Sequence, residues 1–244
     1  MINKVLTTVS ISGIDITVFD SIGQVAKSII SNQGNVISGV AVAINPEKIL
    51  QLRNNPTIQS FIVNASVRYA DGFGVSYAMA NKLKMPVKRI PGCELWEAIM
   101  IRSSIKKIPV YILGSTDEVV EMTKTTLESS GVNVVGARNG YFNDDEQEKI
   151  INLIKISGAK IITVAMGSPK QELFINHCVK TMPQLFYMGV GGTYDVFTGN
   201  VKRAPLLFRY FNCEWLYRLL SQPTRIGRQL NLLKYFLLFI RNKL

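Results

Sequence analysis

The sequence contains little of what histidine or disulfide chemistry requires. Its 244 residues include one histidine, His177, so a mechanism that needs several imidazoles as bases or ligands is poorly supplied. We interpret His177, which falls within a predicted helix, as a structural or surface residue. The three cysteines, Cys93, Cys178 and Cys213, are odd in number and form no CxxC pair, which favours reduced thiols used for packing.

Long apolar runs are also missing. The longest uninterrupted one in the C-terminal segment, Tyr235 to Ile240, has six residues, whereas a membrane-spanning helix needs about 20. The first residues of the chain lack the continuous apolar core of a secretory signal. Because 47% of the residues are hydrophobic, the chain can still build a sizeable core. We therefore expect a cytoplasmic protein that can lie on a membrane surface but cannot cross it.

The common signatures of nucleotide and metal binding are absent from the sequence. No predicted strand ends in GxGxxG, and there is no GxxxxGK[ST] loop, which counts against a dinucleotide-dependent dehydrogenase and a P-loop enzyme. There is no DxD metal signature either. The acidic run Asp144-Asp145-Glu146 follows Asn143 at a predicted helix start, where carboxylates interact favourably with the helix dipole. We interpret this run as helix capping.

Negative charge is nearly absent from the C-terminal end of the chain. Residues 202–244 contain nine Lys or Arg against one acid, Glu214, and so carry +8 of the formal net charge of +11. This segment contains an apolar stripe at helical spacing with basic residues on its flanks. Such a pattern is typical of a helix that lies on an anionic membrane surface. The stripe comprises Leu230, Leu233, Leu237 and Ile240, flanked by Arg228, Lys234 and Arg241. The alternative is a helix that packs on the rest of the chain or on another subunit.

The change in charge predicts two parts, a body over residues 1–201 and a basic, membrane-associating appendage over 202–244. In the body, apolar runs typical of strands alternate with helical patterns. The predicted strands are Val36–Ile44, Val67–Ala70, Pro109–Leu113, Val132–Val135, Lys160–Met166 and Leu185–Val190, with a hairpin or edge strand in Val5–Val18. The predicted helices are Ser21–Ile30, Cys93–Ile105, Thr116–Ser129, Asp144–Ser157 and Pro169–Lys180, with Gly131 and Gly158 just beyond helix ends. This alternation predicts an α/β fold with a doubly wound, mostly parallel, Rossmann-like sheet and helices on both faces.

Polar and glycine-rich loops follow the predicted strands. In an open α/β sheet, ligands bind beyond the carboxyl ends of the strands, so these loops should converge on one cleft. Glycines let backbone N–H groups approach an anion. Asn45 and Ser168 each precede a proline and would cap a helix whose N-terminus faces the cleft. Because helix N-termini bind anions, these features imply a phosphorylated ligand. Each glycine alone could equally make a simple turn. The loops are 45–46, 71–72, 114–115, 139–141, 167–171 and 191–195.

Five stretches of this sequence resemble the WecG/TagA/CpsF glycosyltransferases. They are Val42–Lys48, Tyr69–Gly72, Val164–Glu172, Tyr187–Gly199 and Glu214–Leu220, and the resemblance extends from about residue 36 to 235. It implies an inverting, metal-independent, membrane-peripheral hexosyltransferase without a cofactor, whose C-terminal appendage completes the active site. The implied partners are a UDP-sugar donor, an undecaprenyl-pyrophosphate-linked acceptor and the inner leaflet of the cytoplasmic membrane.

The resemblance is strongest to the WecG branch. Members of the TagA branch have a Thr two residues before the Asn, where this chain has Ala43. The WecG branch implies transfer of N-acetyl-D-mannosaminuronic acid from UDP to undecaprenyl-pyrophosphoryl-GlcNAc in enterobacterial common antigen synthesis. The alternative within the family is another donor, such as UDP-ManNAc, in teichoic acid or capsule synthesis.

The resemblance also implies roles for individual residues. Asp71 would be the catalytic base, with Asn45 and Gln171 as polar groups against donor or acceptor. Arginines of the appendage would neutralise the departing diphosphate, because guanidinium suits bidentate phosphate contacts; these are Arg218, Arg225 and Arg228. The other candidates are Tyr141, Gly191, Gly192 and Asp195 for UDP, and Arg89, Lys170 and Arg203 for the rest of the substrate, including a donor carboxylate. The alternatives are that Asp71 is a helix cap or turn residue, and that the arginines form a solvated or lipid-facing surface.

One further function class uses the positive charge differently. A nonenzymatic nucleic-acid-binding module could exploit the net charge of +11. Such a module should place its basic and aromatic residues in a groove, however, rather than beside a leucine-rich stripe. We therefore expect no nucleic-acid partner, and the sequence leaves an oligomer possible.

Overall fold

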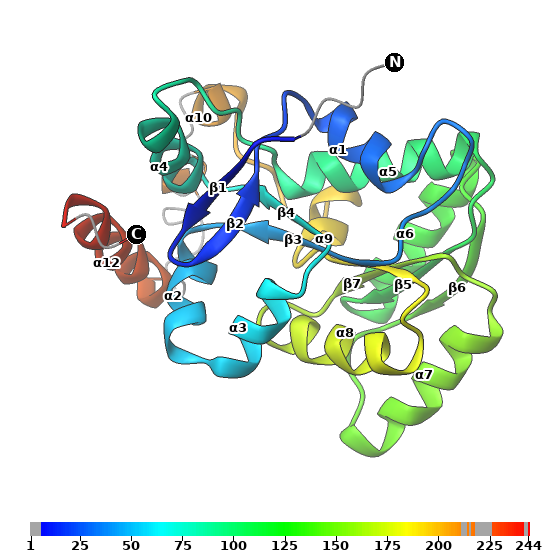
Figure 1. The fold of residues 1–244 in the computed structure, drawn as a ribbon. Helices are drawn as coiled ribbons and strands as arrows, with labels where there is room; N and C mark the ends of the chain where they lie inside the picture. The colour runs from blue at the N-terminus through cyan, green and yellow to red at the C-terminus, as the bar shows by residue number, and fades with distance from the viewer. Residues whose placement is uncertain (1–5, 211–213, 215, 218–225, 242–243) are drawn as a thin grey trace.

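The computed structural model describes residues 6–210, 214, 216–217, 226–241 and 244. Its centre is an eight-stranded sheet in the order β1-β2-β4-β3-β8-β7-β5-β6 (Figure 1). Only the β1–β2 hairpin is antiparallel, and every other pair is parallel. The strands are β1 (Thr8–Ile11), β2 (Ile14–Thr17), β3 (Gly39–Ile44), β4 (Val67–Ala70), β5 (Val110–Gly114), β6 (Val134–Arg138), β7 (Ile161–Ala165) and β8 (Phe186–Gly189). The predicted mostly parallel sheet with an N-terminal hairpin is confirmed.

Helices cover both faces of the sheet, as the doubly wound prediction requires (Figure 1). One apolar core, around the fully buried Trp96, packs α1 (Ile22–Ile29), α5 (Gly92–Ile105), α6 (Asp117–Ser129) and α9 (Thr193–Phe197) on one face. The other core, on the opposite face, packs α2 (Pro46–Asn54), α3 (Pro56–Val63), α4 (Phe73–Leu83), α7 (Gln147–Ile156) and α8 (Lys170–Thr181). Residues of β5 and β7 are all buried, which explains their continuous apolar runs.

Several helices and strand boundaries differ from the sequence predictions. The cap predicted at Asn45 is confirmed, because its Oδ1 accepts from Lys48 N (3.0 Å) at the start of α2. The helices α3, α4, α9 and α10 (Leu206–Tyr210) were not predicted; Pro56 and Gly74 interrupt the apolar periodicity of the first two, although Asn55 caps α3 as Asn45 caps α2. The strand predicted from Val36 begins at Gly39, and the strand predicted as 132–135 is Val134–Arg138. Helices α6 and α7 end as predicted, with Gly131 and Gly158 in the left-handed region.

The C-terminal segment contributes α10 (Leu206–Tyr210) and α12 (Ile226–Ile240), and α12 packs against α2. Tyr235 is buried, and its hydroxyl donates to the Gly74 carbonyl in α4 (3.0 Å). The ring of Phe239 lies 5.5 Å from that of Tyr77, between centroids. The helix therefore packs on the body, which was the alternative to a purely membrane-bound helix. Its outer side is still apolar and more than half exposed, at Leu233, Phe236, Leu237 and Ile240.

None of the helices that the structure describes combines the length and the hydropathy needed to cross a membrane.

Candidate functional site

Polar loops follow β3, β4, β7 and β8, which are parallel neighbours, so these loops lie at one edge of the sheet. We call it the strand-end edge. The first two loops are in direct contact, because Asp71 N donates to the Ile44 carbonyl (3.0 Å). A Cβ on Gly72 would lie 2.6 Å from Pro46 Cδ, so only glycine allows this approach. The loops that carry Asn45 and Asp71 are therefore brought together, and Gln171 lies at the same edge, in the helix after β7.

Asp71 is half-buried at the end of β4. Its Oδ1 accepts a hydrogen bond from the backbone N–H of Gly92 (3.2 Å), the first residue of α5. The positive end of this 14-residue helix therefore faces the carboxylate and stabilises its negative charge. Asp71 does not cap the helix after β4, because Gly72 is the N-cap of α4 and no side chain caps that helix. Its carboxylate does accept the first N–H of α5, so the alternative of a helix-capping role stands beside the catalytic one.

Tyr69 lies beside this carboxylate and was missed by sequence reasoning. It is 1% exposed, and among the described residues its hydroxyl has no hydrogen-bond partner. A Cβ on Gly92 would lie 3.4 Å from the Tyr69 hydroxyl and 3.7 Å from Asp71 Oδ2, so both groups flank the same glycine. Burial, and then the charge of Asp71, raises the pKa of Tyr69 well above its usual value. The phenol is therefore a neutral hydrogen-bond donor next to Asp71.

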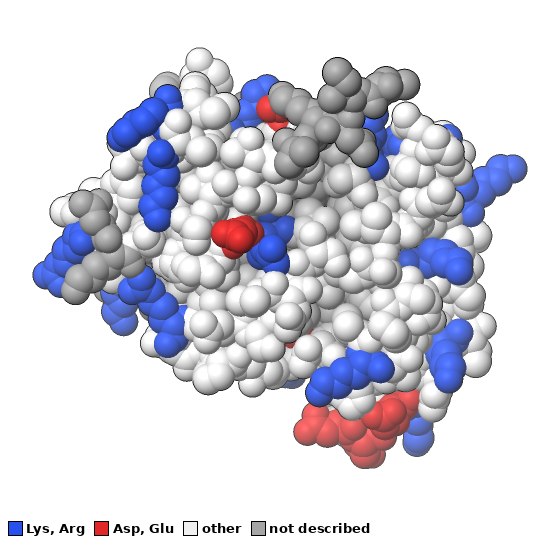
Figure 2. Space-filling model, viewed as in Figure 1, with Lys and Arg blue, Asp and Glu red and all other residues white. Residues whose placement is uncertain are grey.

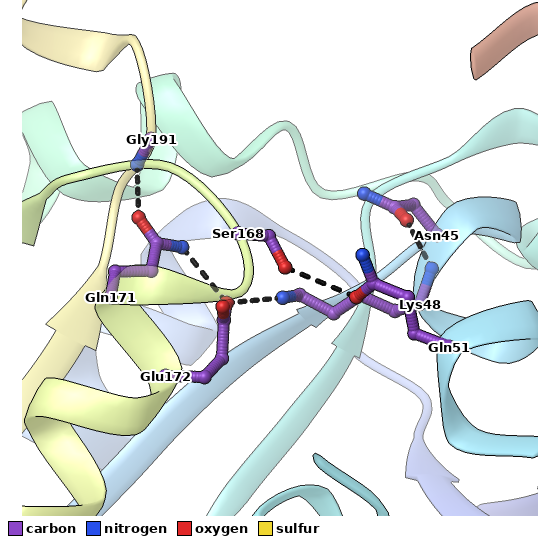
Figure 3. Close-up of polar contacts among 7 residues, drawn as sticks. All are labelled: Asn45, Lys48, Gln51, Ser168, Gln171, Glu172 and Gly191. Atoms are coloured by element: carbon purple, nitrogen blue, oxygen red, sulfur yellow. Dashed lines mark hydrogen bonds and ion pairs between the residues drawn. The ribbon is translucent and has the colours of Figure 1, made fainter. Parts of the chain in front are cut away.

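Gln171 is buried at the start of α8 and connects two loops (Figure 3). Its Oε1 accepts from Gly191 N (2.9 Å), and its Nε2 donates to Glu172 Oε1 (3.0 Å). A Cβ on Gly189 would lie 2.7 Å from the Gln171 Nε2, so the close packing of β8 against this amide requires a glycine. The structure thus brings together two of the predicted site residues, Gln171 and Gly191.

A buried ion pair lies beneath these side chains (Figure 3). Lys48 Nζ of α2 is 2.5 Å from Glu172 Oε1 of α8, and the two side chains are 9% and 3% exposed. Sequence reasoning did not single out either residue, although both lie in stretches that carry the family resemblance. The predicted cap Ser168 is wrong: Pro169 occupies the N-cap position of α8, and the Ser168 hydroxyl instead donates to Gln51 Oε1 (3.0 Å).

Asp195 belongs to a second group of loops, after β5 and β8. Its Oδ2 accepts from the Ser115 hydroxyl (3.3 Å) and its Oδ1 from Asn200 Nδ2 (3.0 Å). Gly192 is the N-cap of α9, which carries Asp195. Tyr141, in contrast, is 74% exposed, so the structure does not gather the four predicted UDP residues into one enclosed pocket.

Two predicted substrate cations, Arg89 and Arg203, are already paired with carboxylates. Arg89 Nη2 is 2.7 Å from Glu214 Oε2, and Arg203 Nε is 3.8 Å from the other oxygen of the same carboxylate. Arg203 also pairs with Glu94 through Nη2. Burial raises the pKa of the neighbouring Cys93 thiol; Arg203 opposes this increase and Asp71 adds to it. These ion pairs, which we call the Glu214 network, join the C-terminal segment to the body near Asp71.

The remaining predicted cations are not part of this network. Lys170 is exposed at the first position of α8. Arg218 and Arg225 lie outside the described residues, and so does the side chain of Arg228. Their proposed contact with diphosphate stays a prediction.

The single histidine and the acidic run have structural partners. His177 joins α8 to α7 through Glu148 Oε1 (2.8 Å) and Gln147 Nε2 (2.7 Å). Glu146 accepts from Asn143 N (3.2 Å) at the start of a short 3₁₀ turn, which confirms the capping interpretation of Asp144-Asp145-Glu146. Within the part of the chain that the structure describes, no three His, Cys, Asp or Glu side chains group together as metal ligands would.

The sequence matches a known protein family over most of its length. Residues 9–244 match the model described as the glycosyl transferase WecG/TagA/CpsF family. The matched residues include the C-terminal segment, and therefore α12.

Proposed function

The chain belongs to the WecG/TagA/CpsF glycosyltransferase family, and from that premise we propose the reaction. The enzyme inverts the anomeric centre as it transfers N-acetyl-D-mannosaminuronic acid from UDP to undecaprenyl-pyrophosphoryl-GlcNAc, a step of enterobacterial common antigen synthesis. The observation that carries the proposal is the Asp71 carboxylate, held at the strand-end edge by the first N–H of α5.

In the proposed reaction, Asp71 removes the proton from the acceptor hydroxyl. The hydroxyl oxygen forms a bond to the anomeric carbon, the bond from that carbon to the β-phosphate oxygen breaks, and UDP leaves. A single base is sufficient because the nucleophile and the leaving group are on opposite faces of the sugar. The Gly92 N–H holds Asp71 Oδ1 at the strand-end edge, and in this proposal the same carboxylate accepts the proton of the acceptor hydroxyl.

The charge of the departing diphosphate needs neutralisation. We propose that Arg218, Arg225 and Arg228 supply it, without a metal or cofactor, because guanidinium groups bind phosphate oxygens in pairs. The Glu214 network supports this assignment, since it attaches the segment that carries Arg218 to the body beside Cys93 and Asp71.

We also propose that the enzyme works on the cytoplasmic face of the inner membrane, where a lipid-linked acceptor resides. The outer side of α12 exposes Leu233, Phe236, Leu237 and Ile240, with Lys234 and Arg241 exposed beside them. Figure 2 shows basic side chains on the α12 side of the molecule, and others spread over the rest of this face, including beside the acidic group near α7. The basic residues beside the apolar side of α12 fit an anionic leaflet, to which each basic residue near the surface contributes about 1 kcal/mol.

One observation favours a second donor. A uronate donor needs a cation for its carboxylate, but two of the three candidates, Arg89 and Arg203, are paired with Glu214 and Glu94. A donor whose sugar carries no carboxylate, such as UDP-ManNAc in teichoic acid or capsule synthesis, needs no such cation.

Product analysis tests both donors. The purified enzyme is incubated with undecaprenyl-pyrophosphoryl-GlcNAc and, separately, with UDP-ManNAcA, UDP-ManNAc and other UDP-sugars, and the lipid product is identified by mass spectrometry. Transfer from UDP-ManNAcA alone supports the first proposal, and transfer from UDP-ManNAc alone supports the second. If none of the sugars is transferred, and oligonucleotide or NAD rather than UDP raises the melting temperature, the glycosyltransferase proposal fails.

A further inference from the structure

We propose that Lys48 and Glu172 are positioning residues, which hold the amide side chains of Asn45 and Gln171 in place at the strand-end edge. This inference rests on the proposed function, because it concerns the geometry of the same site. Neither residue is at a loop tip where substrate would bind; each follows a candidate site residue by one to three positions on a helix (Figure 3).

The first step of the argument is the connection between Lys48 and Asn45. Asn45 is the N-cap of α2, and its Oδ1 accepts from the backbone N–H of Lys48 (3.0 Å). The side chain of the same lysine then reaches Glu172 on α8. Movement of Lys48 would therefore move the residue that orients the Asn45 amide.

The second step is the connection between Glu172 and Gln171. Glu172 Oε1 accepts from both Lys48 Nζ (2.5 Å) and Gln171 Nε2 (3.0 Å). Because one oxygen holds the Gln171 amide nitrogen, the amide oxygen points to Gly191 N (2.9 Å). A continuous set of polar contacts thus connects the loops after β3, β7 and β8, and it passes through the ion pair.

The third step is the burial of the pair. The Lys48 and Glu172 side chains are 9% and 3% exposed, and Glu172 Oε2 has no hydrogen-bond partner among the described residues. Desolvation of two charges offsets much of their attraction, so a buried pair is weak evidence for stability and is often replaceable by apolar residues of similar volume. Its placement between two candidate site residues instead indicates a role in geometry.

The fourth step excludes direct contact with a sugar. The cavity beside the pair, lined by Ala43, Phe61 and Gly189 among others, has a volume of about 10 Å³. That volume holds about one water molecule, whereas ligand pockets measure about 300–1,000 Å³. Lys48 and Glu172 therefore act through Asn45 and Gln171.

The test is a variant that removes both charges together, Lys48→Met/Glu172→Met. We expect it to fold with a melting temperature near that of the wild type, because no unpaired buried charge remains. We expect kcat for sugar transfer to fall about 10- to 100-fold, since a small displacement of site groups has effects of this size. The affinity for UDP, measured by calorimetry, should stay within about threefold, because the loop backbone is retained.

Tyr187→Phe is the matched control. It removes buried hydrogen bonds from the Tyr187 hydroxyl to the carbonyls of Met182 and Cys178, at the other end of α8. It should lower the melting temperature without lowering kcat, which separates loss of stability from loss of positioning. If the double variant is insoluble, Glu172→Gln provides the comparison, with an expected fall in kcat of about tenfold. This variant leaves the Lys48 charge buried without its carboxylate, so its melting temperature should fall as well, and Tyr187→Phe shows whether such a loss of stability alone lowers kcat.

A double variant, or Glu172→Gln in its place, with kcat within twofold of an active wild type would overturn the inference and leave the proposed function intact. A wild-type enzyme that transfers no sugar from any donor would overturn the proposed function, and the inference with it.

Discussion

Two sets of ion pairs lie close to the candidate site, and they differ in how they are built. The Lys48–Glu172 pair is almost completely buried and connects two helices of the body. The Glu214 network is partly exposed, with Glu214 at 17% and Glu94 at 35%, and it connects the body to the C-terminal segment. Exposed ion pairs contribute only about 0–1 kcal/mol each, whereas loss of one partner from a buried pair costs about 3–5 kcal/mol. From this difference we predict that the part of the proposed site in the body is the rigid half, and that the part proposed for the C-terminal segment is the adjustable half.

The largest expected effect lies in the rigid half. Asp71→Asn keeps the shape of the side chain but removes the base, so turnover should fall by about 10² to 10⁴. Affinity for UDP should change little, because Asp71 acts on the acceptor hydroxyl. Initial rates and calorimetry with UDP measure the two quantities. Asp15→Asn, an exposed substitution in β2, is the control; undiminished turnover in Asp71→Asn would remove this residue from the role of base.

The next effect lies in the adjustable half. Glu214→Gln breaks the contacts to Arg89 and Arg203 and should lower kcat/KM for the lipid-linked acceptor by about tenfold, because the C-terminal segment is no longer held beside Asp71. The melting temperature should change by no more than a few degrees, since the pairs are partly exposed. Glu121→Gln, which breaks an exposed pair on α6, serves as control. A loss of stability without a loss of activity would show that the network is only structural.

A substitution on the outer side of α12 separates membrane contact from catalysis. Leu237→Ser should weaken binding to vesicles that contain phosphatidylglycerol by about 10- to 100-fold, because a leucine that enters the bilayer boundary contributes about 1.5–3 kcal/mol. Cosedimentation measures the binding. Turnover of a water-soluble acceptor analogue should be unchanged. Leu153→Ser, on the similarly exposed face of α7, should bind vesicles like the wild type; equal loss in both variants would contradict a specific membrane face.

The smallest expected effect concerns the packing of α12 on the body. Tyr235→Phe removes one hydrogen bond, from the buried hydroxyl to the Gly74 carbonyl. The free energy of unfolding should fall by about 1 kcal/mol, which corresponds to about 2–4 °C in melting temperature for a chain of this size. Calorimetry measures the shift. A melting temperature equal to that of the wild type would show that α12 does not depend on this contact.

Local signals account for the parts of the fold that could be predicted. The alternation of apolar strands and amphipathic helices predicted the parallel sheet, and Gly131 and Gly158 marked helix ends through their backbone geometry. The helices α3 and α4 were missed because the proline and glycine at their starts resemble a loop. Asn45, Asp71 and Gln171 could be placed at the strand-end edge because each directly follows a strand or opens the helix after it.

The ion pairs of the site could not be predicted in the same way. Lys48 and Glu172 are 124 residues apart in the sequence, and Arg89 and Glu214 are 125 apart. No local pattern indicates such pairings, because they depend on which loops the sheet order brings together. The same limit explains why Arg89 and Arg203 were predicted to bind a substrate carboxylate, whereas in the structure they contact carboxylates of the protein itself.

The two-sided character of α12 has a consequence for how the enzyme would meet its acceptor. Its inner side is fixed to the body by Tyr235, and Lys82 of α4 donates to the carbonyl of Leu244 (3.0 Å) just beyond the helix. In the proposed membrane-bound state, a bilayer against the outer side would therefore also set the tilt of the whole sheet relative to the lipid headgroups. The distance from Asp71 to the membrane surface would then follow from how α12 is attached to the body, and not from the site loops alone.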